Sequence, residues 1–153
     1  MENKKNKEAI MFIGIQASGK SSYYQKYFGD YPHVNLDTLH TRNKENMMLQ
    51  ECFKNQESFV IDNTNPTAAE RAKYISLAKE NGYMVYGYYF RSSISECIER
   101  NKLREGIARL PDKALVCTHS KLEIPQYEEG FDKLFYVQII DDKFVTEAWE
   151  ETS

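Results

Sequence analysis

Short apolar runs alternate along the chain with longer segments in which apolar and polar positions are mixed. Runs of this kind, bounded by glycine or polar residues, are typical of buried strands. We therefore predict strands at residues 9–13, 33–36, 59–61, 83–90 and 134–140. The fourth run is rich in Tyr, Val and Phe, the side chains that strands favour.

The mixed segments between these runs predict helices. Two of them cover residues 20–28 and 38–54. Proline and capping signals mark where three more helices begin, at Pro66, at the capping-box pair Ser93 and Glu96, and at Pro111. Gly82 ends the helix that Pro66 opens.

Strands and helices that alternate at these lengths favour a parallel sheet with helices on both faces, an α/β fold of three layers, α/β/α. With 153 residues, a single domain at residues 1–153 is expected. In sheets of this kind, ligands bind beyond the carboxyl ends of the strands. The residues that follow the first three predicted strands are therefore the first candidates for chemistry.

Charge and composition narrow the class of protein. The chain carries 20 Lys and Arg against 23 Asp and Glu, a net charge of −3, which argues against a protein that coats nucleic acid nonspecifically. An enzyme that binds one end of a strand through a few local cations stays open. No apolar run approaches the roughly 20 residues of a membrane span. Residues 1–8 are polar and lysine-rich, which argues against a secretory leader.

The three cysteines are Cys52, Cys97 and Cys117. They are widely spaced and form no Cys-x-x-Cys pair, so neither a zinc site nor a disulfide framework is predicted. We expect a cytoplasmic protein with no membrane association and no obligate protein partner.

The clearest motif follows the first predicted strand. Residues 14–21 read Gly-Ile-Gln-Ala-Ser-Gly-Lys-Ser and fit Gly-x-x-x-x-Gly-Lys-Ser, a phosphate-binding loop (P-loop) between a strand and a helix. Its N–H groups and the helix N-terminus attract phosphate oxygens. The predicted nucleotide-binding residues are Gly14, Gln16, Ala17, Ser18, Gly19, Lys20, Ser21 and Ser22. We expect Lys20 to reach the β- and γ-phosphates of ATP, and Ser21 to bind Mg²⁺.

Two carboxylates follow the neighbouring strands. Asp62 ends the third strand, where a Walker-B-type carboxylate holds Mg²⁺ or its water, although the run after it is also good turn chemistry. Asp37 follows the second strand, where it either accepts a proton from an attacking hydroxyl or caps the next helix. If the sheet is parallel, Gly14, Asp37 and Asp62 emerge at one edge.

Cations gather between residues 91 and 113, with acidic residues mixed among them and Gly106 as a hinge. One explanation is a helix whose charges pair four residues apart. The other, which we favour, is a mobile lid at about residues 100–113 whose arginines stabilise charge on a transferred phosphoryl group. Arg104 and Arg109 are the predicted catalytic residues of this lid.

Four further blocks strengthen this interpretation. Residues 33–39 read His-Val-Asn-Leu-Asp-Thr-Leu, residues 62–74 begin Asp-Asn-Thr-Asn-Pro, residues 100–105 read Arg-Asn-Lys-Leu-Arg-Glu, and residues 128–132 read Glu-Glu-Gly-Phe-Asp. With the P-loop and in the same order, they resemble the kinase domain of polynucleotide 5′-hydroxyl kinase. The chain is still more similar to small stand-alone bacterial P-loop kinases, AAA or zeta-toxin-like, for which we assign no substrate.

The resemblance implies a fold and a set of roles. Kinases of this kind order their strands 2-3-1-4-5. Asp37 would activate the 5′-hydroxyl of a nucleic acid, and Arg104, with Arg109 as a second candidate, would reach the transferring phosphoryl group. The candidate contacts to the acceptor are His40, or Arg42 in its place, and Arg71. A further alternative is that neither His40 nor Arg42 contacts the acceptor. For Arg71, a place on a solvated helix face is an equal alternative.

The chain departs from the kinase pattern at three places. Gln16 and Ala17 stand where these kinases usually have Pro-Gly, Leu36 replaces an Arg before the base, and His40 replaces an Arg that holds the acceptor. We therefore keep three functions in view. The favoured one is transfer of the ATP γ-phosphate to the 5′-OH of a polynucleotide; the alternatives are a small-molecule kinase and a nucleotide-dependent ATPase switch.

Overall fold

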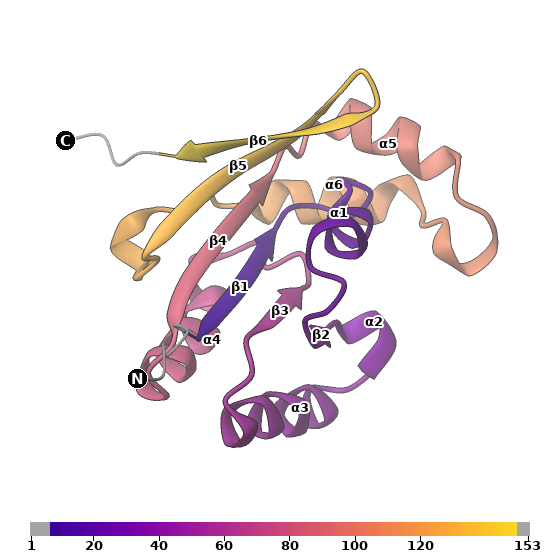
Figure 1. The fold of residues 1–153 in the computed structure, drawn as a ribbon. Helices are drawn as coiled ribbons and strands as arrows, with labels where there is room; N and C mark the ends of the chain where they lie inside the picture. Colours follow the sequence, from indigo (N-terminus) through magenta and orange to yellow (C-terminus); the bar gives the residue numbers. More distant parts are fainter. Residues whose placement is uncertain (1–6, 150–153) are drawn as a thin grey trace.

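The computed structural model describes residues 7–149, in which the strands form one six-stranded sheet in the order β2-β3-β1-β4-β5-β6 (Figure 1). The strands are β1 (Glu8–Ile13), β2 (His33–Val34), β3 (Phe59–Asp62), β4 (Met84–Phe90), β5 (Lys133–Ile140) and β6 (Lys143–Trp149). The predicted order of the first five strands is confirmed. The question of a leader concerns residues 1–6, which lie outside the described residues.

Six α-helices and two 3₁₀ turns connect the described strands. The helices are α1 (Lys20–Tyr27), α2 (Leu36–Leu39), α3 (Arg42–Asn55), α4 (Ala68–Glu80), α5 (Ile94–Lys102) and α6 (Asp112–Lys121). The 3₁₀ turns are η1 (Gly106–Ala108) and η2 (Tyr127–Glu129). Between Lys7 and Trp149, no helix is long and apolar enough to cross a membrane.

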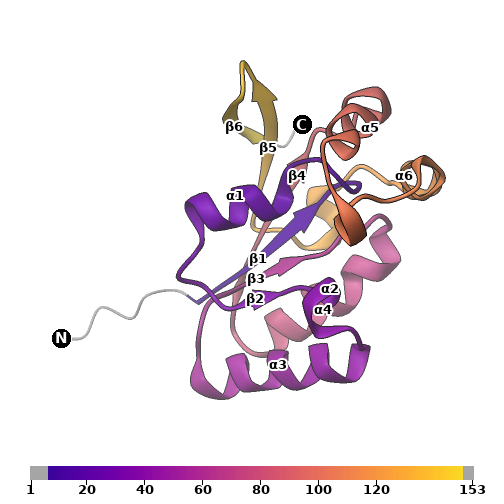
Figure 2. The same ribbon diagram turned by 90° about the vertical axis from the view of Figure 1, so that its right-hand side faces the viewer.

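The central strand β1 shows why the sheet needs a helical layer on each face. It pairs in parallel with both β3 and β4, and five of its six residues are buried. Ala9, Met11 and Ile13 pack in the core with side chains of α3 and α4, whereas Ile10 and Phe12 pack with Tyr23 of α1. The side views place α1 on one face and α3 with α4 on the other (Figures 1 and 2).

Helices α5 and α6 lie at the carboxyl edge of the sheet, beside the P-loop (Figure 2). A small apolar cluster joins them to the loop: Ile15 and Ala17 pack with Cys97 of α5 and Leu115 of α6. The segment between these helices, the predicted lid, therefore starts and ends against the P-loop.

The predicted helix at residues 38–54 is two helices, and the predicted strand at 33–36 is shorter. Leu36 belongs to α2, which ends at His40 in a left-handed conformation with φ 70°. Thr41 then caps α3 by accepting a hydrogen bond from the N–H of Lys44. Helix propensity continues across the break, but the backbone turns there, so α2 and α3 run in different directions.

The sequence pattern predicted that the strand at 134–140 would be the last one, but the structure has one more strand after it. Strand β6 returns antiparallel to β5, so the sheet is mixed at this edge. The connection is a two-residue turn in which Asp141 and Asp142 have φ of 51° and 61°. Positive φ at both central positions is the geometry that tight hairpins require, and Asp tolerates it.

Two predicted helix starts differ in detail. Thr67, not Pro66, caps α4, by accepting a hydrogen bond from the N–H of Glu70. At α5 the Ser93 hydroxyl caps the helix as predicted, but the carboxylate of Glu96 binds Arg91 at 2.9 Å instead of completing the capping box.

Candidate active site

The P-loop connects β1 to α1 and has a backbone that only small residues permit. A Cβ atom on Gly14 would lie 2.9 Å from Oγ of Ser18 and 3.0 Å from Cβ of Phe90. Gly19 has φ 101°, a conformation that side chains disfavour. The N–H of Gly14 donates to the carbonyl of Thr64 at 3.0 Å, which fixes the loop to the segment after β3.

Ala17 holds a position that glycine would fill more easily. Its φ is 63°, in the left-handed region, which costs a residue with a Cβ about 1 kcal/mol. The residue is buried, and its carbonyl accepts a hydrogen bond from Arg100 at 3.5 Å. Packing against α5 therefore keeps the loop in its phosphate-binding shape although the loop lacks this glycine.

Lys20 lies inside the loop that it serves. Its Nζ donates to the carbonyls of Gly14 at 2.9 Å and Ile15 at 2.7 Å. Burial lowers the pKa of Lys20 to about 8, and the Asp62 carboxylate opposes that shift. The side chain is already directed into the loop, where the incoming phosphates would take over its hydrogen bonds.

Asp62, at the end of β3, is only 2% exposed and is held from two sides. Its Oδ2 accepts hydrogen bonds from Oγ of Ser21 at 3.1 Å and from Nε2 of His33 at 2.7 Å. A hydroxyl and a carboxylate are the oxygen ligands that Mg²⁺ takes in nucleotide sites, with phosphates and water completing its shell. Within residues 7–149, no group of three or more His, Cys, Asp or Glu converges as an all-protein metal cage. Ser21 and Asp62 would supply two of these oxygen ligands to a bound Mg²⁺.

Asp37 is placed by the asparagines around it. Asn35 caps α2 by accepting from the N–H of Thr38, and its amide donates to the carbonyl of Asp62 at 2.6 Å. The side chain of Asn63 accepts from the N–H of Leu36 at 3.0 Å. The cap that the sequence allowed Asp37 to form is thus supplied by Asn35, so Asp37 is not needed as a cap.

One cleft of about 730 Å³ brings seven of the predicted site residues together at the carboxyl edge of the sheet. The predicted site residues that line it are Gln16, Ala17, Lys20, Ser21, Asp37, Asp62 and Arg104. Gly14 and Ser18 are buried, and Nζ of Lys20 lies 2.9 Å from the carbonyl oxygen of Gly14 and 3.4 Å from Oγ of Ser18. The lid contributes Arg104, Ile107 and Leu110 to the cleft wall.

Eight predicted residues do not line this cleft: Gly14, Ser18, Gly19 and Ser22 of the P-loop, and His40, Arg42, Arg71 and Arg109. Arg109 is exposed on the lid, and His40 is exposed at the end of α2. Arg42 donates to Oε1 of Glu45 at 3.1 Å and to the hydroxyl of Tyr74 at 2.6 Å. Burial, followed by the Glu45 carboxylate, raises the pKa of Tyr74 to about 12. The Arg42 guanidinium is therefore bound to α4 and to the buried Glu45.

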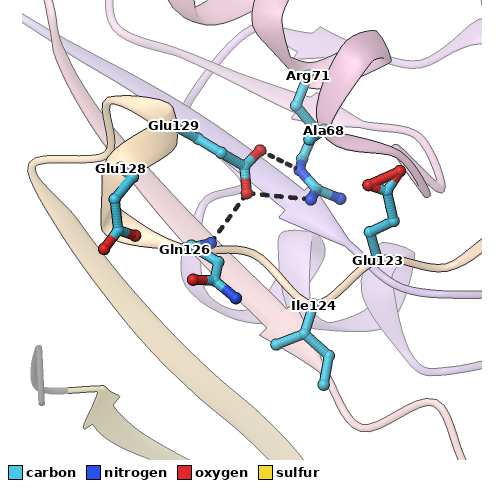
Figure 3. Close-up of a pocket in the computed structure, with 7 residues that line it drawn as sticks. All are labelled: Ala68, Arg71, Glu123, Ile124, Gln126, Glu128 and Glu129. Atoms are coloured by element: carbon cyan, nitrogen blue, oxygen red, sulfur yellow. Dashed lines mark hydrogen bonds and ion pairs between the residues drawn. The ribbon is translucent and has the colours of Figure 1, made fainter.

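The position of Arg71 contradicts the interpretation that places it on a solvated helix face. Arg71 is 0% exposed, so it does not lie on a solvated face, and it does not line the cleft. Its guanidinium binds the Glu129 carboxylate at 2.8 and 3.1 Å (Figure 3). It also donates to the carbonyl of Asn65 at 2.9 Å. Glu129 also accepts from the N–H of Gln126 at 2.9 Å. Arg71 thus joins α4 to η2 beside a separate hollow of about 520 Å³.

Sequence reasoning missed the side chains that hold the site in place. Asn35 was visible only as part of a predicted strand and Asn63 only as a turn residue, and His33 received no chemistry. Their partners lie 27 and 29 positions away, so no local spacing reveals them. Gln16 is a similar case, since its amide donates to the hydroxyl of Thr118 on α6 at 2.9 Å.

The fold and the cleft define the class as a P-loop protein of the small-kinase type, with a nucleotide-binding cleft at the switch point of the sheet. Comparison with protein families agrees. Residues 10–124 match the AAA_33 family, described as an AAA domain, and the chain belongs to this family.

Two curated proteins are similar over most of the chain. One is named "Putative bifunctional polynucleotide phosphatase/kinase", from Acanthamoeba polyphaga mimivirus, and is 33% identical over 147 residues, 91% of this chain and 35% of its own length. The other is the bifunctional polynucleotide phosphatase/kinase of Schizosaccharomyces pombe, 30% identical over 94% of this chain and 36% of its own length. The chain thus spans about a third of each relative.

A solved structure supports the fold. A gluconokinase from Sinorhizobium meliloti 1021 superposes with a TM-score of 0.59 and 22% identity, covering 88% of this chain and 84% of its own. At that identity the similarity describes the architecture of the domain and not its acceptor.

Proposed function

We propose that the chain is an ATP-dependent phosphotransferase and that its acceptor is the 5′-OH of a polynucleotide. The observation that carries this proposal is the convergence of Lys20, Ser21, Asp37, Asp62 and Arg104 in one cleft. A protein that only binds and releases nucleotide needs neither a second carboxylate nor a lid arginine there. The ATPase-switch alternative is therefore the weakest of the three.

The P-loop amides and the Lys20 ammonium bind the β- and γ-phosphates of ATP. When the phosphates bind, the hydrogen bonds of the Lys20 ammonium to the carbonyls of Gly14 and Ile15 are replaced by hydrogen bonds to phosphate oxygens. Ser21 and Asp62 would hold Mg²⁺, which when bound neutralises charge on the β- and γ-oxygens.

Asp37 accepts the proton of the acceptor hydroxyl. The acceptor oxygen forms a bond to the γ-phosphorus while the bond between that phosphorus and the bridging oxygen breaks, so that ADP leaves with the electron pair. Arg104 stabilises the charge on the transferring group. Arg109 joins it if lid closure carries it into the cleft.

The polynucleotide acceptor is supported by the names of the two curated relatives, whose matched regions cover nearly the whole chain. One observation favours a small-molecule acceptor instead. None of the predicted acceptor contacts His40, Arg42 and Arg71 lines the cleft, and the neutral Leu36 precedes the proposed base.

A labelled γ-phosphate transfer assay with Mg²⁺ separates the two acceptors. The panel contains DNA and RNA oligonucleotides with a 5′-OH, the same oligonucleotides with a 5′-phosphate, and nucleosides and sugars. We expect label on the 5′-OH oligonucleotides alone, and none with Lys20→Ala. Label on a small acceptor, with unlabelled oligonucleotides, would replace the polynucleotide proposal.

A further inference from the structure

His33 is the one histidine whose ring touches a proposed metal-site carboxylate in residues 7–149. It lies at the start of β2, next to β3 in the sheet, and pairs with Val60 in register. This pairing brings its Nε2 to 2.7 Å from Oδ2 of Asp62. The side chain of His33 is 27% exposed, whereas that of Asp62 is 1% exposed. A partly exposed imidazole therefore contacts a buried carboxylate.

The direction of this hydrogen bond follows from the acceptor. An ionised carboxylate has no proton to give, so Nε2 carries the hydrogen and donates it. The Ser21 hydroxyl donates to the same oxygen at 3.1 Å. Among the described residues, no hydrogen bond reaches the second oxygen, Oδ1. Two donors on Oδ2 therefore orient the carboxylate and leave Oδ1 available to a ligand in the cleft.

The His33 ring is itself held in place. The ring of Tyr24, from α1, stacks on it with centroids 3.8 Å apart and planes 10° apart. The Tyr24 hydroxyl in turn donates to the carbonyl of Tyr31, just before β2. An imidazole fixed by stacking on one side and by a carboxylate on another has little rotational freedom.

We propose that His33 is a positioning residue that orients Asp62 toward the Mg²⁺ of a bound nucleotide. The inference rests on the magnesium role of Asp62 in the proposed function. Residues that hydrogen-bond metal-binding carboxylates orient them, and their loss weakens metal binding by about 10-fold to 100-fold. His33 does not touch substrate in this scheme; it acts through Asp62.

The alternative is that His33 serves only to pack against Tyr24. Two substitutions separate the roles. His33→Phe keeps a ring that can stack but has no N–H donor, and His33→Gln keeps an N–H donor near the Nε2 position but no ring. A positioning role needs the donor, whereas a packing role needs the ring.

The readout is nucleotide binding and requires no acceptor. A fluorescent ADP analogue is bound to each variant in EDTA and then titrated with Mg²⁺. We expect His33→Phe to raise the Mg²⁺ concentration at half effect about tenfold, with unchanged binding in EDTA, and His33→Gln to stay within about twofold of the parent protein. His33→Leu serves as the donor-less variant if His33→Phe does not fold, and a melting curve checks each protein.

An unchanged Mg²⁺ response in His33→Phe or His33→Leu would overturn the inference and leave the proposed function intact. The same holds if His33→Gln and His33→Phe lose Mg²⁺ response equally. If the parent protein itself binds the analogue equally well with and without Mg²⁺, the magnesium role of Asp62 fails, and the inference fails with it.

Discussion

At the residue scale, burial decides the behaviour of Lys20. The ammonium is satisfied by two carbonyls of its own loop, yet burial lowers its pKa to about 8. Bound phosphates favour the charged form and raise that pKa again. Nucleotide binding therefore takes up a proton wherever the unliganded lysine is neutral.

This linkage predicts a pH dependence with a definite sign. Below about pH 8, Lys20 is charged both in the unliganded protein and in the ATP complex, so its titration does not change the affinity for ATP. Above about pH 8, binding must protonate the lysine, so affinity falls by up to about tenfold per pH unit. Calorimetric titration of ATP between about pH 7 and pH 9.5 measures this. Lys20→Met should bind more weakly and without that slope, and an equal slope in Lys20→Met would assign the proton to another group.

Arg104 and Arg109 lie on the same proposed lid, but only Arg104 lines the cleft. Arg109 is therefore a matched control for Arg104. We expect Arg104→Ala to lower kcat about 100-fold, since it removes the positive charge that stabilises the transferring phosphoryl group. Arg109→Ala should change kcat by less than about threefold. Steady-state kinetics with saturating ATP measures both. Equal losses would mean that the closed lid brings Arg109 to the phosphates as well.

The site residues that the sequence predicted are those of a linear motif or of a strand end. Lys20, Ser21 and Asp62 follow from the P-loop pattern and from an apolar run that ends in a carboxylate. His33 and Asn63 could not be predicted in the same way, because their roles depend on which strands become neighbours. Arg71 was misplaced because helix periodicity does not reveal its partner, Glu129, 58 positions away.

At the element scale, the two ends of the proposed lid are joined by hydrogen bonds between Asn101 and Leu110. Asn101 is buried and bonds both backbone groups of Leu110, at 2.6 and 3.0 Å. Between these residues the chain is open to solvent, with Ile107 99% exposed. If this segment moves as the proposed lid, these hydrogen bonds would confine the movement to the eight residues between them, 102–109.

The ion pair between α4 and η2 gives a stability prediction. Glu129→Ala leaves the Arg71 guanidinium buried without its carboxylate, which we expect to cost about 3 kcal/mol of unfolding free energy. Glu128→Ala, at the exposed neighbouring position, is the control and should cost less than about 0.5 kcal/mol. Urea unfolding measures both. Equal, small changes would show that the pair contributes little and that the contacts around it hold α4.

Kinetic measurements can distinguish a structural role of Arg71 from the substrate contact that the resemblance implied. Arg71→Met should lower stability, but kcat/KM measured below the unfolding transition should stay within about threefold of the parent protein. A large rise in KM for the acceptor, in a protein that is still folded, would return Arg71 to the acceptor site.

Elements were predicted well where a hydrophobic run is long and poorly where the backbone changes direction. The strands at 9–13 and 83–90 coincide closely with β1 and β4. The break between α2 and α3 depends on the left-handed φ of His40, which apolar periodicity does not encode. Strand β6 was missed because its hairpin turn is Asp-Asp, a weaker signal than Asn-Gly.

At the scale of the whole molecule, the charge of −3 limits how the protein can hold a polynucleotide. A polynucleotide that the protein contacts only at its end releases few counterions on binding. If about two phosphates are contacted, the logarithm of affinity for a 5′-OH oligonucleotide should fall with the logarithm of salt with a slope of about −1.4. Fluorescence anisotropy at several salt concentrations measures the slope. A slope near zero would favour an uncharged small acceptor.

One comparison tests both the proposed base and the proposed acceptor: the parent protein and Asp37→Asn on one 5′-OH oligonucleotide, with γ-labelled ATP and Mg²⁺. We expect labelled oligonucleotide with the parent protein. With Asp37→Asn we expect transfer reduced by about 100-fold or more and ATP binding unchanged, because the substitution removes only the proton acceptor. Undiminished transfer by Asp37→Asn would contradict the assignment of the base. No transfer by a parent protein that binds ATP would contradict the polynucleotide acceptor itself.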